Sequence, residues 1–348
     1  MIIDMHCHVV PKDFDPADSR SSARDWPVME HFEPGRARVM IGDSNFRTVT
    51  SQNWDSDRRV EDMAREGVDA QVISPMPQLL SYWFTARDGL EMSRYLNEFI
   101  AEMAHFSPDK FHGLGIVPMQ DPENATKELT EVKKLGLRGV EIGTNVVGLS
   151  LAEERFLPFF KEAERLDLSV FVHALHPTMV DRIQGPEVAL NAIGFPTETG
   201  LTIGSMIAAG VFEAVPELRL AFSHGGGTFP ALLPRMQNAW TRTWNGEAPG
   251  PDTPATPLRE RLQKSPYESA RTLYYDTLVF DHRAIRYLAD LMGTSQLAIG
   301  TDYPFAEREQ PVGKTLASMG FSTDELEDMT SRNCLRFLGI SGEINASD

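Results

Sequence analysis

The chain is predicted to adopt an α/β fold, specifically a (β/α)8 TIM barrel in a single domain spanning its 348 residues. Short apolar segments alternate with longer segments of helical periodicity along the whole chain, which is typical of a parallel sheet covered by helices. Both kinds of segment number eight, the count of a barrel. An open doubly wound sheet shows the same alternation and is the alternative.

The strand predictions rest on short apolar runs bounded by glycine, proline or polar residues. The eight predicted strands are Ile2–His6, Asp69–Ser74, His112–Val117, Gly139–Gly143, Ser169–His173, Leu218–His224, Leu273–Leu278 and Gln296–Asp302. The helix predictions rest on apolar residues three and four positions apart. They cover Arg58–Glu66, Gly89–His105, Pro122–Leu135, Glu153–Leu166, Glu198–Val215, Pro230–Thr241 and Arg283–Met292, and a C-terminal helix at Thr323–Leu338.

Two segments depart from this alternation. Residues 11–57 form an insertion after the first strand that is too long for a simple loop. Within it, Arg38–Ile41 and Phe46–Thr50 flank a Gly-Asp-Ser-Asn turn and predict a β-hairpin. Because it follows a strand, the insertion is expected at the C-terminal face of the barrel, as a lid over the active site. The second segment, Trp244–Pro266, is rich in proline and glycine and is predicted to be a loop.

The composition excludes several classes of partner. The chain has 33 Lys and Arg against 50 Asp and Glu, a net charge of −17, which argues against binding to nucleic acid or to anionic membranes. Its two cysteines cannot build a disulfide framework, and its N-terminus, MIIDMHCHVV, lacks the basic region of a signal peptide. The longest apolar run is too short to cross a bilayer. We therefore expect a soluble, cytoplasmic protein that acts on a small molecule.

Polar residues at the ends of predicted strands indicate a metal site. His6 and His8 are two positions apart on one strand, so both side chains should point to the same face. His173, His224 and Asp302 end three further strands. Imidazole and carboxylate ligands suit one divalent ion per chain, zinc first, while manganese, iron and cobalt accept the same donors. Such an ion with an open coordination position lowers the pKa of a bound water, and no organic cofactor is required.

Longer motifs around these residues resemble the amidohydrolase superfamily. The segments are Asp4–Pro11 (DMHCHVVP), His224–Pro230 (HGGGTFP) and Gly300–Phe305 (GTDYPF). They are most similar to the decarboxylase branch of the aminocarboxymuconate-semialdehyde decarboxylase type. Matching motifs run from the first strand to the C-terminal helix, so the resemblance covers essentially the whole chain.

The resemblance implies a single metal bound by His6, His8, His173 and Asp302, with His224 as the catalytic acid or base beside Asp302. A bridging lysine for a second metal is absent from the fourth strand. That strand instead carries Glu141, which is either a further metal ligand or an ordinary hydrogen-bonded carboxylate. His176 is the alternative to His173 as a ligand.

The resemblance also implies the substrate contacts. Arg47 matches the position that binds the substrate carboxylate, and Arg235 matches an arginine supplied by a neighbouring subunit, which predicts a homodimer or higher homo-oligomer. Trp83 would line the pocket. This chain departs from the family by reading His-Ala-Leu-His-Pro-Thr-Met after the fifth strand and by carrying Asn191 in place of a tryptophan. The pocket thus loses two aromatic walls and gains His176, a candidate substrate contact.

The leading functional hypothesis is metal-dependent, non-oxidative decarboxylation of an unsaturated or aromatic carboxylic acid, similar to an aminocarboxymuconate-semialdehyde-like ring-fission product. The alternative is metal-dependent hydrolysis of a lactone or a carbon–carbon bond in such a product. A third hypothesis is a barrel that only binds ligands, which the complete set of histidines and Asp302 disfavours.

Overall fold

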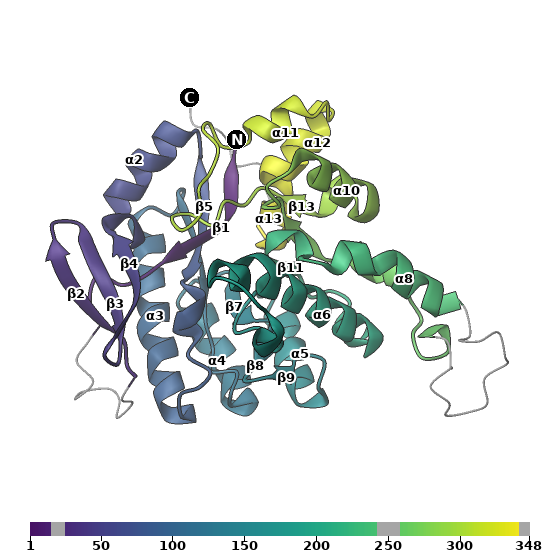
Figure 1. Cartoon of the computed structure of the whole chain (residues 1–348), viewed down its shortest axis with the longest axis horizontal. Helices are drawn as coiled ribbons and strands as arrows, with labels where there is room; N and C mark the ends of the chain where they lie inside the picture. Colours follow the sequence, from purple (N-terminus) through teal and green to yellow (C-terminus); the bar gives the residue numbers. More distant parts are fainter. Residues whose placement is uncertain (15–24, 242–257, 341–348) are drawn as a thin grey trace.

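Eight parallel strands form one sheet, and its order follows the chain, as the sequence predicts for a (β/α)8 barrel. The computed structural model describes residues 1–14, 25–241 and 258–340 (Figure 1). The barrel strands are β1 (Ile3–Val9), β5 (Ala70–Pro75), β6 (Phe111–Gly115), β7 (Gly139–Gly143), β10 (Ser169–His173), β11 (Leu220–Phe222), β12 (Tyr274–Asp276) and β13 (Leu297–Ala298). Because β1 and the segment after β13 are hydrogen-bonded, the open-sheet alternative is wrong.

The barrel is closed by β1 and residues 299–303, which we call the seam. Three backbone hydrogen bonds cross it: from Met5 to Ile299 at 2.9 Å, from His8 to Tyr303 at 2.7 Å, and from Asp302 to His6 at 2.8 Å. The last strand itself has only two residues. The barrel is therefore completed by the same residues that the sequence predicts as metal ligands.

Helices surround the barrel and agree with the predicted segments in most places (Figure 1). They are α2 (Ser56–Glu66), α3 (Ala86–Phe106), α4 (Pro122–Lys134), α5 (Leu157–Arg165), α6 (Phe195–Ala208), α7 (Val211–Ala214), α8 (Phe229–Thr241), α9 (Pro266–Ala270), α10 (His282–Met292), α11 (Lys314–Ser318), α12 (Thr323–Glu327) and α13 (Asn333–Phe337). The single helix predicted over 198–215 is divided into α6 and α7 at Gly210, whose φ of 74° is left-handed. No helix in the described ranges is long and apolar enough to cross a membrane.

The C-terminal helical segment closes the end of the barrel opposite to the predicted site. A π-helical turn, Asp328–Arg332, joins α12 to α13. Cys334 and Phe337 of α13 pack in one hydrophobic cluster with Ile3 and Met5 of β1. This end is filled with apolar side chains, so the opposite, C-terminal mouth is left for chemistry.

The insertion after β1 is a three-stranded antiparallel sheet rather than a two-stranded hairpin. Its strands are β2 (Val28–Glu33), β3 (Arg36–Ile41) and β4 (Ser44–Thr50). The predicted hairpin is β3 and β4, and β2 adds a strand on the other edge of β3. A second small antiparallel pair, β8 (Asn145–Val146) and β9 (Leu149–Ser150), follows β7.

The predicted loop Trp244–Pro266 lies partly outside the described residues. Its described part contains a 3-10 turn, Leu258–Glu260, and leads into α9.

Candidate active site

A β-bulge in β1 orients the two histidines of the HxH motif. Asp4 pairs with Gln71, but the next paired residue, Cys7, is opposite Ile73, so β1 contains one extra residue. Met5 consequently packs in the barrel interior, whereas Cys7 packs in the cluster between barrel and helices. His6 and His8 are both fully buried. A bulge of this kind redirects side chains, and here it places both imidazoles at the barrel mouth.

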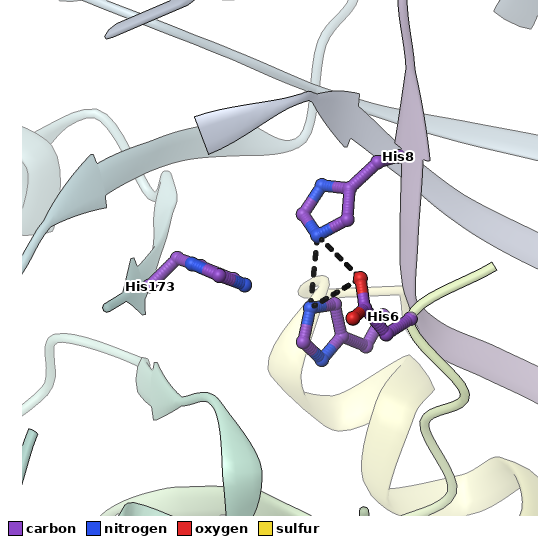
Figure 2. A group of neighbouring side chains, drawn as sticks. His6, His8 and His173 are labelled. Atoms are coloured by element: carbon purple, nitrogen blue, oxygen red, sulfur yellow. Dashed lines mark hydrogen bonds and ion pairs between the residues drawn. The ribbon is translucent and has the colours of Figure 1, made fainter. Parts of the chain in front are cut away.

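His6, His8, His173 and Asp302 form a compact group, which we call the ligand cluster. One potential ligand atom from each residue lies within 4.8 Å of the others. The Nε2 atoms of His6 and His8 are 3.0 Å apart, and Nε2 of His8 is 3.2 Å from Oδ1 of Asp302 (Figure 2). The four residues that the resemblance implies as ligands are thus brought together from three separate parts of the chain.

Each imidazole of the ligand cluster is held through its Nδ1 atom, which leaves Nε2 directed to the centre. Nδ1 of His6 bonds to Asp276 at 2.7 Å, Nδ1 of His8 to the Pro75 carbonyl at 3.0 Å, and Nδ1 of His173 to the Ala174 carbonyl at 2.9 Å. Nε2 of His173 is buried without a hydrogen-bond partner. A buried nitrogen without a partner is costly unless a cation binds it. The donor set and its geometry fit one divalent ion.

Burial and the neighbouring carboxylates set the charges within the ligand cluster. Burial opposes the charged form of His6, but the hydrogen bond to Asp276 raises the pKa of His6 to about 9. Burial lowers the pKa of His8 to about 4. Burial disfavours ionised Asp302, yet its interaction with His8 and the other imidazoles keeps the pKa of Asp302 at about 2. The ionised carboxylate of Asp302 therefore faces Nε2 of His8, whose imidazole is neutral and able to bind a metal.

His224 lies beside the ligand cluster without belonging to it. Its ring centroid is 5.3 Å from that of His6 and 5.1 Å from that of His173. Its backbone is left-handed, with a φ of 55°. Burial lowers the pKa of His224. The imidazole is therefore neutral near neutral pH and available to accept a proton.

The glycines after His224 permit the tight turn that exposes its ring. Gly225, Gly226 and Gly227 all have positive φ angles. A Cβ on Gly227 would lie 2.1 Å from the Pro196 carbonyl oxygen, and one on Gly225 would lie 2.5 Å from Val279. The glycine run therefore forms a close backbone turn that side chains would obstruct.

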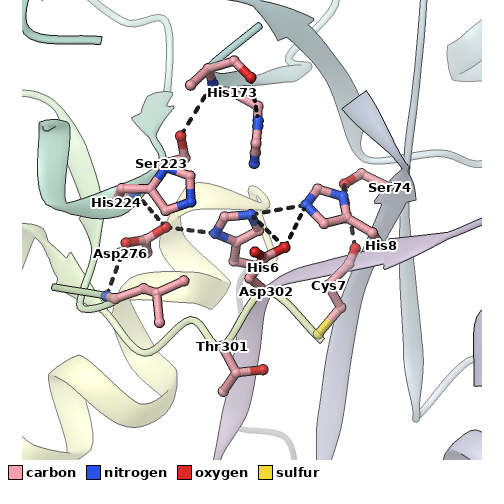
Figure 3. Close-up of polar contacts among 12 residues, drawn as sticks. His6, Cys7, His8, Ser74, His173, Ser223, His224, Asp276, Thr301 and Asp302 are labelled. Atoms are coloured by element: carbon pink, nitrogen blue, oxygen red, sulfur yellow. Dashed lines mark hydrogen bonds and ion pairs between the residues drawn. The ribbon is translucent and has the colours of Figure 1, made fainter. Parts of the chain in front are cut away.

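Asp276 is a functional residue that the sequence analysis missed. Besides accepting from His6, its carboxylate accepts the backbone N–H of His224 at 2.8 Å, as Figure 3 shows. It also accepts the backbone N–H of Gly225 at 3.0 Å. Asp276 therefore fixes both a ligand candidate and the candidate acid or base. The signal was present: Asp276 follows an apolar run in the seventh strand, as His173 does in the fifth.

Four of the predicted strands are longer than the observed ones, among them the sixth and the eighth. His224 and Asp302 were expected at strand ends, but β11 ends at Phe222 and β13 at Ala298. Both residues lie on turns and have left-handed backbones, at φ 55° and 57°. With this backbone, both side chains lie over the barrel mouth and line the cavity there.

A cavity of about 790 Å³ opens above the ligand cluster. His8, His173, His224 and Asp302 form its floor, and Arg47 of β4 lines its wall. The Arg47 guanidinium carbon lies 4.0 Å from the Phe305 ring centroid. The insertion therefore reaches the cavity, as expected for a lid, and supplies the predicted arginine.

Three other predicted substrate contacts lie outside this cavity. Trp83 and His176 stack on each other at 4.8 Å and line a neighbouring cavity of about 480 Å³. Arg235 is exposed on α8. One chain alone thus does not bring these residues to the ligand cluster, and their roles stay predictions.

Glu141 and His176 are not members of the ligand cluster. Glu141 is fully buried on β7, and its Oε2 lies 3.8 Å from Nδ1 of His8, on the far side of that ring from Nε2. Burial raises the pKa of Glu141 to about 8. His173, rather than His176, provides the third imidazole.

The fold and this site define a metal-dependent barrel enzyme, and comparison with known proteins identifies its family. The amidohydrolase family model matches residues 3–340. The 2-amino-3-carboxymuconate-6-semialdehyde decarboxylase of Dictyostelium discoideum is 35% identical over 343 residues, which cover 97% of this chain and 91% of that protein. A gamma-resorcylate decarboxylase of Polaromonas sp. is 26% identical over 285 residues, which cover 76% of this chain and 82% of that protein.

Solved structures agree with this result. The 5-carboxyvanillate decarboxylase of Sphingomonas paucimobilis has a TM-score of 0.76 at 25% identity, covering 98% of this chain and 99% of that one. A second structure is that of a dihydroxybenzoic acid decarboxylase of Polaromonas sp., solved with bound manganese and the inhibitor 2-nitroresorcinol. It has a TM-score of 0.75 at 21% identity, and the match covers 100% of this chain and 99% of that one. The chain belongs to the amidohydrolase family, and within it to the decarboxylase branch that it matches along nearly its whole length.

Proposed function

We propose that this enzyme removes CO2 from an unsaturated or aromatic carboxylic acid without oxidation, using one divalent ion bound by His6, His8, His173 and Asp302. The observation that carries the proposal is the convergence of three Nε2 atoms and one carboxylate beneath a cavity that also contains His224 and Arg47. When bound, the ion supplies Lewis acidity, which stabilises negative charge on substrate oxygen.

Loss of CO2 from an sp² carbon leaves an electron pair in an orbital outside the conjugated system. The conjugation must therefore be interrupted before the carbon–carbon bond breaks. His224 is placed to move the required proton. It either takes a proton from a water that adds to the substrate or, once protonated, gives one to the carbon that bears the carboxylate. The bond to CO2 then breaks, and its electron pair restores the conjugated system. Where water has added, His224 first returns its proton to the carbon that bears the carboxylate, and the electron pair then expels the added hydroxide.

Arg47 orients the carboxylate. Its guanidinium carries two parallel donors that match a carboxylate, and its stacking on Phe305 holds the planar group in place. We further propose that Arg235 reaches the same cavity from a second copy of the chain in a homodimer. Its exposed position on α8, away from its own ligand cluster, accords with that role. Trp83 and His176 would then contact the outer part of the substrate.

The proposal also includes the identity of the ion, zinc, and the cellular compartment, the cytoplasm. Zinc suits three imidazoles and one carboxylate, and manganese, found in the Polaromonas structure, is the main competitor. The two free, buried cysteines accord with the reducing cytoplasm.

The direct test is metal analysis combined with a product assay. Purified protein should contain one divalent ion per chain and release CO2 from members of a panel of muconate semialdehydes and hydroxybenzoates. Chelation should abolish release, and the divalent ion should restore it. A ring-opened acid formed without CO2 would contradict the proposal and indicate the hydrolytic alternative.

A further inference from the structure

The inner face of α2 carries charged residues where a barrel helix normally carries apolar ones. Arg59, Asp62 and Glu66 occupy positions i, i+3 and i+7, so they share one face of the helix. Arg59 and Asp62 are fully buried, and Glu66 is 2% exposed. Buried charges are expensive to desolvate, so their placement calls for a specific role.

Arg59 contacts the backbone of a ligand-cluster residue. Its Nη1 donates to the His8 carbonyl at 2.9 Å and to the Gln52 carbonyl at 2.8 Å, while Nε donates to Gln71 of β5 at 3.0 Å. These bonds fix the guanidinium in one plane and tie the end of β1 to the neighbouring strand. Arg59 therefore restrains the backbone of His8, from which the ring projects.

The same guanidinium contacts the other side of the seam. Its carbon lies 4.6 Å from the ring centroid of Tyr303, the residue that follows Asp302. Arg308 lies over the same ring at 4.4 Å, and the Tyr303 hydroxyl donates to Asp62 at 2.9 Å. Cations over an aromatic ring are attracted to it, and more strongly when water is excluded.

The second arginine is itself anchored to α2. Arg308 makes two hydrogen bonds of 2.7 Å to Glu66. Arg59, Arg308 and Asp62 thus surround Tyr303, and Glu66 anchors Arg308. Asp62 also pairs with Arg58 and Arg65 of the same helix. All of them are fixed to α2 or to the segment that follows Asp302.

We propose that Arg59 is a positioning residue for the metal site, holding His8 directly and Asp302 through the Tyr303 ring at the spacing that a shared ion requires. Nε2 of His8 and Oδ1 of Asp302 are 3.2 Å apart although they belong to opposite sides of the seam. Arg59 touches both sides: the His8 carbonyl on one and the Tyr303 ring on the other. Arg308 supports it from the solvent side.

The test compares Co2+ binding by metal-free wild type, Arg59→Met and Arg59→Lys, measured by competition with a chelating dye. Visible absorption of bound Co2+ reports the coordination geometry, and melting of the metal-free proteins reports stability separately. Arg59→Met should weaken Co2+ binding by about 10- to 100-fold and alter the absorption, as loss of a group that orients ligands does elsewhere. Arg59→Lys keeps a buried cation and should recover part of the affinity.

A purely structural role has a different signature. Arg59→Met would then melt at a lower temperature but bind Co2+ with wild-type affinity and spectrum, and that result would overturn the proposal.

If Arg59→Met does not fold, Arg308→Met is tested in its place, with Arg94→Met as its matched control. Arg94 also forms a two-pronged pair, with Glu128, but it lies between α3 and α4, away from the seam. Arg308→Met should weaken Co2+ binding about tenfold relative to Arg94→Met, and equal affinities would overturn the proposal. Because no substrate is involved, failure of the decarboxylase assay leaves this test intact.

Discussion

The carboxylate of Asp276 accepts a hydrogen bond from Nδ1 of His6 at 2.7 Å, so the seventh barrel strand fixes a ligand candidate on the first. Such a carboxylate sets the tautomer of the imidazole and makes it a better metal ligand. The contact also restrains the turn that carries His224, because that turn donates two backbone N–H groups to the same carboxylate.

Replacing this carboxylate should weaken metal binding. We expect Asp276→Asn to raise the dissociation constant for a divalent ion by about 10- to 100-fold, since the amide no longer enforces the His6 tautomer. Competition with a chelator measures the change. Asp290→Asn, an exposed substitution on α10, is the control and should bind as wild type does. Equal affinities for both variants would show that Asp276 does not support the ligand.

Removing the candidate acid or base should separate catalysis from metal binding. We expect His224→Ala to lower the rate of CO2 release by about 100- to 10,000-fold while retaining one metal ion per chain. The reason is that His224 lies beside the ligand cluster and is not a member of it. Release of CO2 and metal content are measured on the same preparation. Normal turnover by this variant would end the assignment.

Replacing Arg47, on β4 of the insertion, should weaken substrate binding. We expect Arg47→Met to raise KM by about 10- to 100-fold, which corresponds to the loss of a charge-assisted hydrogen bond to the carboxylate. Arg38→Met, on the neighbouring strand β3, changes a partly exposed arginine that lies outside the cavity lining and is the matched control. If both variants have the wild-type KM, the substrate carboxylate is bound elsewhere.

The buried carboxyl of Glu141 should make metal-free protein less stable as the pH rises. Its pKa increases from 4.5 to about 8 on folding, so between these values the folded chain holds a proton that the unfolded chain has lost. The free energy of unfolding therefore falls as pH rises through this window. We expect Glu141→Gln to melt at a higher temperature than wild type at pH 9, by a margin that shrinks toward pH 5. Thermal melts of chelated protein across this range provide the check. A margin that is independent of pH would contradict the shift.

Local sequence patterns were sufficient to predict the barrel and most of the residues that gather at its mouth. Alternation of strand and helix segments depends on neighbouring residues, and His6, His8 and His173 adjoin strongly apolar runs. The bulge in β1 could not be predicted, because it exists only in the pairing of β1 with β5. Strict alternation from Ile3 would have pointed His6 away from the barrel interior.

Other features escaped prediction because they depend on contacts between distant residues. Asp276 acquires its role from bonds to His6 and to the His224 turn, which lie 270 and 52 positions away. Strands β11 and β13 end before His224 and Asp302 are reached, and the apolar patterns do not indicate the left-handed backbones of these two residues. Strand β2 has an exposed, polar face with little apolar periodicity, so it was not recognised as part of the lid.

The two-residue final strand links metal uptake to the integrity of the whole fold. Since ligands from both sides of the seam would share one ion, occupancy joins the beginning of the chain to a segment near its end, much as a cross-link would. We therefore expect the amide hydrogens of Met5, His8 and Asp302 to exchange with solvent faster after chelation. That of Val170, within the continuous part of the sheet, should keep its rate. If chelation increases the exchange rate by the same factor at Val170 as at these three residues, the ion stabilises the whole protein and has no special effect where the barrel closes.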